Sequence, residues 1–202
     1  MDMKAKELLK HSARTAIIAS SFSRHYLKMP EDEINNLFAS ALLHDIGKLF
    51  IPNNILYKES KLIEKEFEEI KKHPVYSYNL LSASNKFNEK VLRAVKEHHE
   101  RIDGRGYPLG LIGDEISFLS KILSICDAYE AMTTDRCYQK AKSNEEAIVE
   151  IKKGLGTQFD KELGLCFIDF AREEMPKDYM IKPTAFYHDV FPLVMYGSIN
   201  VV

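Results

Sequence analysis

Apolar residues recur at helical spacing along almost the whole of this 202-residue chain, and this periodicity limits the fold more than any other feature. The spacing is found in the segments 4–26, 30–45, 63–74, 75–81, 88–100, 116–132, 143–154 and 161–171. Strand-like alternation is weak and confined to the C-terminal tail. The sequence therefore predicts an all-α bundle of about six to eight helices.

Helix-end signals support these segments. Pro30 is followed at once by acidic residues, as at the start of many helices. Ser143 and Glu146 form a capping-box pattern, and Gly154 ends that segment. Beyond Met175 the composition changes to three prolines and many aromatic residues. We predict a domain over 1–175 and an irregular appendage over 176–202 that packs on it, with a homodimer contact as the alternative use of the appendage.

Composition excludes several classes of protein. Hydrophobic residues make up 45% and charged residues 29%, which is typical of a globular domain. The net charge of −2 leaves no electrostatic footprint for duplex nucleic acid. No run of about 18 apolar residues predicts a membrane-spanning helix. The three cysteines form no CxxC pair, so we expect reduced thiols and a cytoplasmic protein.

Five of the seven histidines lie in predicted helical segments beside other residues of metal-binding type, namely His11, His44, His73, His98 and His99. Each feature alone has an ordinary structural explanation. Glu7 and His11, four residues apart, would suit a solvated helix pair. Considered together with Asp45 and Asp127, however, the histidines are poorly explained by ordinary structural roles.

The His44-Asp45 doublet directly follows the apolar run Ala41-Leu42-Leu43. Burying such a pair is costly unless it has partners, and a bound cation would satisfy it. Histidine and carboxylate ligands suit manganese, iron or zinc. The eight candidate ligands exceed the needs of one ion, which indicates at least two ions about 3.5–4 Å apart with Asp45 as the bridge.

Several motifs together resemble the HD-GYP domain, a branch of the HD metal-dependent phosphohydrolases. They are HDIGK over 44–48, His73-Pro74, HHERIDGRGYPLGLIG over 98–113, and DAYEAMTTDRCY over 127–138. The resemblance covers about residues 5–172, and its longest motif is highly specific. It implies an HD-type helical bundle that hydrolyses cyclic di-GMP to linear pGpG, to GMP, or to both.

The resemblance also implies the ligand sets. Two divalent ions, with iron or manganese the usual choice, would bind to one site of His11, His44, Asp45 and Asp127 and another of Asp45, His73, His98 and His99. Glu7 stands where some members supply a ligand for a third ion. Asp45 and Lys48 are the expected catalytic residues.

Four residues are expected to bind the substrate: Lys48, Tyr107, Arg136 and Gln139. Lys48, one helical turn after His44, would face a phosphate or donate a proton to the leaving oxygen. Arg136 offers a planar fork for another phosphate. Gln139 departs from the family, which commonly has a basic residue there, and this leaves the choice of cyclic dinucleotide open.

Two other functions stay open at this point. One is a phosphodiesterase for another cyclic or linear dinucleotide, such as cyclic GMP-AMP. The other is a non-catalytic module that binds a nucleotide or a protein. The sequence shows no sensor or receiver domain, so we expect a regulatory domain or protein in trans, or a chain that is one part of a longer protein.

Overall fold

The structure is a computed structural model that describes residues 3–135, 140–173 and 175, with side chains from Glu7 onward. The all-α prediction is confirmed, because these residues contain no strand and, apart from the single turn α3, eight α-helices. In chain order the helices are α1 (Met3–Ser21), α2 (Glu31–Leu43), α3 (Asn53–Leu56), α4 (Glu64–Ile70), α5 (His73–Ala83), α6 (Glu89–Glu97), α7 (Phe118–Thr133), α8 (Asn144–Lys153) and α9 (Lys161–Glu173).

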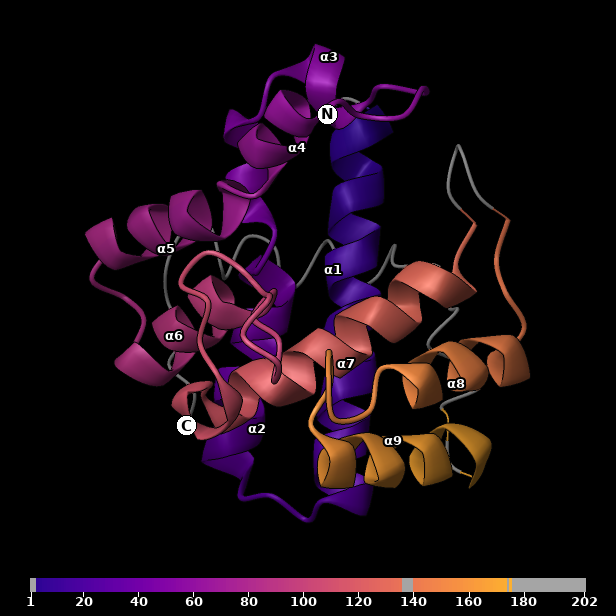
Figure 1. Cartoon of the computed structure of the whole chain (residues 1–202). Helices are drawn as coiled ribbons and strands as arrows, with labels where there is room; N and C mark the ends of the chain where they lie inside the picture. The colour runs from indigo at the N-terminus through magenta and orange to yellow at the C-terminus, as the bar shows by residue number, and fades with distance from the viewer. Residues whose placement is uncertain (1–2, 136–139, 174, 176–202) are drawn as a thin grey trace.

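Helix α1 is the central column of the bundle. It packs against α2 and α7, and α7 runs across it near mid-height (Figure 1). A π-helical turn, Phe22–Tyr26, extends α1 before the chain reverses into α2. Pro30 is the N-cap of α2 and three acidic residues occupy its first turn, as the sequence predicts.

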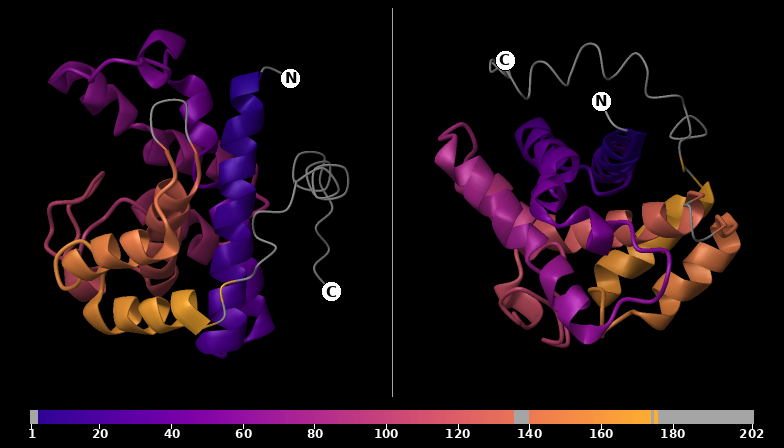
Figure 2. Two further views of the ribbon diagram at one scale, coloured as in Figure 1. Left: turned by 90° about the vertical axis from the view of Figure 1, so that its right-hand side faces the viewer. Right: turned by 90° about the horizontal axis from the view of Figure 1, so that it is seen from above.

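The main core lies where α1, α7, α8 and α9 meet. The rings of Phe22 and Phe167 meet edge to face with centroids 5.2 Å apart, and Tyr129 packs on Phe167 at 5.4 Å. All three side chains are buried. Helices α8 and α9 pack on each other at one side of α7, as two views show (Figures 1 and 2). The predicted capping box of Ser143 and Glu146 opens α8.

A smaller core supports the other side of α2. It is formed by apolar residues of α2, α5 and α6: Leu43, Leu81, Val91, Leu92 and Val95. Because Leu43 immediately precedes His44, this cluster backs the segment that carries the His-Asp doublet.

Among the residues that the structure describes, no helix combines the length and the apolar character that crossing a bilayer requires. The predicted appendage over 176–202 lies outside the described residues, so the boundary at 175 and its packing stay predictions.

Candidate metal centre

The His-Asp doublet lies at a break between two helices. Helix α2 ends at Leu43, and His44 is its C-cap. Asp45 has φ −99° and ψ 3°, the bridge region that many active-site residues occupy. A 3-10 helix over Ile46–Phe50 follows. The predicted helical segment over 30–45 ends within two residues of the observed end of α2. The Asp45 side chain lies near His11 of α1, His73 of α5 and His98 after α6.

One group of ligands gathers around Asp45 from the α5 and α6 side. Its candidate ligand atoms all lie within 4.8 Å of one another and belong to Asp45, His73, His98 and His99. His73 begins α5, and its Nε2 lies 3.1 Å from Oδ1 of Asp45. His98 and His99 follow the end of α6. Because the helix stops there, both neighbours reach the same point, as the sequence predicts.

A second group gathers on the α1 and α7 side, with ligand atoms of His11, His44 and Asp45 within 4.8 Å of one another. Nε2 of His11 lies 2.9 Å from the Asp127 carboxylate, and Nε2 of His44 lies 3.6 Å from it. The structure thus brings Asp127, from the middle of α7, to the same point as two histidines that precede it by more than eighty residues.

The two oxygens of Asp45 divide between the groups. Oδ1 faces His73 at 3.1 Å, and Oδ2 faces Nε2 of His44 at 3.4 Å and of His11 at 3.6 Å. Asp45 is buried, so neither oxygen is open to bulk water. A carboxylate in this position could bind one cation through each of its oxygens.

Backbone carbonyl groups orient three of the histidines in the same way. Nδ1 of His44, His73 and His98 each donates to the carbonyl oxygen three residues earlier, at 2.7, 2.8 and 2.7 Å. A proton held on Nδ1 leaves Nε2 with a free lone pair. All three Nε2 atoms therefore point into the cluster, and burial lowers the pKa of His73 and His98, which keeps those two rings neutral with Nε2 free to bind a metal.

Burial and charge fix the protonation of the cluster. Burial lowers the pKa of His99 to about 3 and that of His98 well below its usual value, which keeps both rings neutral. Burial is the strongest single influence on His44 and acts to lower its pKa, but the charges and hydrogen bonds of Asp45 and Asp127 together outweigh it and raise the value to about 10. Burial acts to raise the pKa of Asp45, yet His44 and Lys48 hold it well below its usual value.

The residues present fit divalent cations. Nε2 of His44 and Oδ1 of Asp45 are buried and make no hydrogen bond of normal geometry to any described residue. A buried polar atom without a partner costs free energy. The donor set of imidazole nitrogens and carboxylate oxygens is typical of manganese, iron or zinc. Divalent cations between these side chains would satisfy both atoms.

Comparison with known families agrees with this geometry. A family model described as an HD domain matches residues 1–163. The chain belongs to the HD domain family. The resemblance found in the sequence is thereby confirmed. Several relatives of this HD domain are named as cyclic di-GMP phosphodiesterases.

The cyclic di-GMP phosphodiesterase PA4108 of Pseudomonas aeruginosa is 35% identical over 78% of this chain and 38% of its own length. The 3'3'-cGAMP-specific phosphodiesterase 3 of Vibrio cholerae is 34% identical over 91% of this chain and 39% of its own length. The HD domain thus spans less than half the length of these curated relatives. Their activities belong to proteins with additional sequence.

A solved structure supports the fold. It is described as Bd1817, a HDG"Y"P protein from Bdellovibrio bacteriovorus, and it superposes with a TM-score of 0.69. The match covers 85% of this chain and 55% of that one, at 19% sequence identity. At this identity the likeness establishes the architecture of the HD domain and not its substrate.

The remaining predicted site residues differ in position. Lys48 Nζ lies 2.5 Å from Asp45, beside the cluster. The Tyr107 ring packs on His99, with centroids 4.7 Å apart. Glu7 is exposed, pairs with Lys10 at 2.6 Å and joins neither group, so its role for a third ion stays a prediction. Arg136 and Gln139 lie outside the described residues.

Sequence reasoning gave no role to two buried carboxylates of this HD domain. Glu130 accepts a hydrogen bond from Nδ1 of His11 and another from Arg14 at 2.5 Å. Glu100 accepts three backbone N–H groups of the loop after Tyr107. A signal for Glu130 exists in the sequence, because it follows Asp127 by three residues on one helix face.

Proposed function

We propose that this HD domain hydrolyses a phosphodiester bond of cyclic di-GMP with the aid of two divalent ions, giving linear pGpG, GMP or both. The observation that carries the proposal is the position of Asp45. Its two oxygens face separate groups of histidines, which is the arrangement suited to a pair of ions. Relatives named as cyclic di-GMP phosphodiesterases supply the substrate class.

The ions, when bound, supply an activated water nucleophile and stabilise charge on the phosphoryl oxygens. The side chains of the protein orient these ions and the substrate. Hydrogen bonds from Nδ1 to backbone carbonyl groups turn Nε2 of His44, His73 and His98 toward the cluster. The buried surroundings keep this region at low dielectric, which strengthens electrostatic contacts to a phosphate.

Lys48 places an ammonium group beside the cluster. Its ammonium group lies 2.5 Å from Asp45, and its side chain keeps 20% of its exposed area. It therefore reaches both the buried carboxylate and the solvent side from which a substrate enters. In the proposed reaction it binds the scissile phosphate and donates a proton to the leaving oxygen.

The test compares Asp45→Asn and Lys48→Met with the unchanged protein. We expect D45N to lose bound metal and turnover together, because the bridging carboxylate is gone. We expect K48M to keep its metal and to lose about a hundredfold or more in kcat, as for removal of a general acid. Elemental analysis, product chromatography and a thermal melt are measured on each preparation.

Asp169→Asn is the matched control, because Asp169 is exposed on α9, away from the candidate ligands. It should retain both metal and turnover. Normal hydrolysis of cyclic di-GMP by a folded D45N protein would contradict the proposal.

A second candidate substrate is cyclic GMP-AMP. It is favoured by the relative named as specific for 3'3'-cGAMP, which covers 91% of this chain. The glutamine at position 139 replaces a basic residue of the family pattern, and it is the sequence feature that motivates this alternative. Turnover of both cyclic dinucleotides by one metal-loaded preparation distinguishes them, and a higher kcat/KM for cyclic GMP-AMP would favour the second candidate.

A further inference from the structure

Lys71 lies between two aromatic rings on the rim of the metal centre. It belongs to the short link between α4 and α5, two residues before His73. Its Nζ lies 4.9 Å from the centroid of the Phe67 ring and 6.0 Å from the centroid of the Tyr107 ring. Both distances fall within the range of cation–π contacts. Lys71 belongs to neither group of candidate ligands, so metal binding does not explain its position.

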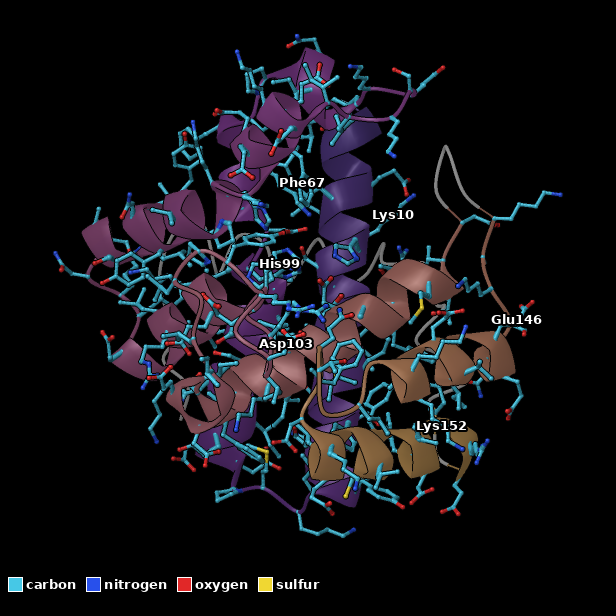
Figure 3. All side chains as sticks on the ribbon, viewed as in Figure 1. Lys10, Phe67, His99, Asp103, Glu146 and Lys152 are labelled. Atoms are coloured by element: carbon cyan, nitrogen blue, oxygen red, sulfur yellow. The ribbon has the colours of Figure 1, made fainter. Side chains whose placement is uncertain are left out.

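A series of side-chain contacts leads from His99 to the exposed Phe67. The Tyr107 ring lies over His99 at 4.7 Å with an angle of 31° between the planes. The Lys71 ammonium group contacts the Tyr107 ring on one side and the Phe67 ring of α4 on the other. Phe67 is a large apolar residue that stays 45% exposed, and it points from α4 toward the part of the molecule where His99 lies (Figure 3).

The side chains of Phe67, Lys71 and Tyr107 suit the binding of a purine base. Aromatic faces stack on any nucleobase and contribute about 1–3 kcal/mol per base in single-stranded complexes. A lysine ammonium has three donors and no acceptor. Guanine presents two acceptors, O6 and N7, on the edge where adenine presents the N7 acceptor beside an N6 donor. Lys71 would therefore favour guanine over adenine.

Lys71 is available for such a contact. Its present partner is Glu68 at 2.6 Å, three residues earlier, and the Glu68 side chain is 58% exposed. An ion pair in that setting contributes little to stability, so exchanging it for a base costs little. The ammonium also stays close to the surface, because the Lys71 side chain is 31% exposed.

We propose that Lys71, between Phe67 and Tyr107, binds the O6/N7 edge of one guanine of the substrate while Phe67 stacks on that base. This inference rests on the proposed hydrolysis of cyclic di-GMP. It adds the residue that selects guanine, on the α4–α5 link and apart from the metal ligands and from Lys48.

The chain offers a matched control. Lys72 pairs with Glu69 at 2.5 Å through the same three-residue spacing, and its side chain is 52% exposed. Within the described part of the chain it contacts neither Phe67 nor Tyr107 through its ammonium group. Lys71→Met and Lys72→Met thus remove the same charge from neighbouring positions, one partly exposed and one exposed.

The experiment measures kcat and KM for cyclic di-GMP and the inhibition constant of cyclic di-AMP, all with the metal-loaded full chain. The ratio of that inhibition constant to KM reports the preference for guanine. We expect K71M to raise KM about tenfold and to lower the ratio by a similar factor, with kcat and metal content unchanged within twofold. K72M should leave every value unchanged within twofold.

Phe67→Leu tests stacking separately. It keeps an apolar side chain but removes the ring, so KM and the inhibition constant should rise together while their ratio stays constant. The inference is overturned if K71M leaves the ratio unchanged, including the case in which both constants rise equally because the charge acts on phosphate. The proposed function would survive that result. Absence of turnover by the unchanged, metal-loaded protein would overturn both.

Discussion

The backbone amide of Gly47 donates a hydrogen bond to the hydroxyl of Ser77 at 2.8 Å, which fastens the turn after Asp45 to α5. The same hydroxyl donates to the carbonyl oxygen of His44 at 2.7 Å. A Cβ at position 47 would lie 2.2 Å from the carbonyl oxygen of His73 and 2.5 Å from the amide nitrogen of Ser77. Only glycine therefore allows the His-Asp turn and the start of α5 to approach this closely.

Gly47→Ala should accordingly disrupt the metal centre through the backbone. The added methyl group meets backbone atoms that cannot rotate away, so we expect a loss of about 2–4 kcal/mol in unfolding free energy and a reduced metal content. Denaturant unfolding and elemental analysis measure the two effects. Gly113→Ala is the control, because Gly113 has φ +54° but open space around its Cβ position. It should lose about 1 kcal/mol and keep its metal.

Glu130 is expected to position His11. Its carboxylate is fully buried and bonded to His11 and Arg14, as in the carboxylate–histidine–metal arrangement of many metal sites. Glu130→Gln keeps the volume but weakens this bond, so metal affinity should fall about 10- to 100-fold. Metal titration of the stripped protein measures it, with the exposed Glu162→Gln as control. An unchanged affinity in E130Q would refute the positioning role.

Glu100 is expected to hold the loop that carries Tyr107. Its buried carboxylate accepts the amides of Leu109, Gly110 and Leu111 at 2.6, 3.2 and 3.0 Å. Glu100→Ala would leave three amides without this partner, at a cost of several kcal/mol in local stability. Hydrogen exchange at residues 109–111 should accelerate at least tenfold.

Two further measurements distinguish a role of Glu100 in the loop from a role in metal binding. Metal content should stay unchanged, because Glu100 belongs to neither ligand group. Asp114→Asn changes a fully exposed acid of the same loop, paired with Lys121, and should leave exchange at 109–111 as it was. Slow exchange at those amides in E100A would show that other contacts hold the loop.

Removal of metal should lower thermal stability. Ions that bind only the native state stabilise it by about 4 kcal/mol at a thousand times the dissociation constant. For a domain of this size, that corresponds to roughly 8–16 °C in melting temperature. Calorimetry before chelation, after chelation and after return of manganese measures the shift. The D45N protein should show almost no response to chelator, and an equal response would place the stabilising ions elsewhere.

The helices were predictable because local patterns specify them. The capping box of Ser143 and the acidic start after Pro30 need no distant contact to form, and both are present. The predicted segment 30–45 ends close to the observed end of α2 at Leu43, but the 3-10 helix over Ile46–Phe50 was not predicted. The close approach of Gly47 to α5 in this turn is a tertiary contact, which no local pattern contains.

The candidate ligands were predictable as residue types but not as partners. Histidine doublets in apolar surroundings identified where polar groups would need compensation. That His11 meets Asp127 depends on α7 crossing α1, which brings together two residues more than a hundred positions apart in the sequence. For the same reason Glu130 received no role from sequence alone, although it lies one turn beyond Asp127.

The unequal sequence spans of the two ligand groups bear on how the protein is made. Asp45, His73, His98 and His99 are all present once the first 99 residues have been synthesised. The side of the centre that includes His11 and His44 gains its Asp127 carboxylate only when α7 has emerged and crossed α1. A growing chain thus contains all four residues of the group around His73 before it contains Asp127. The order of synthesis therefore sets the order in which the candidate ligands of the two groups become available.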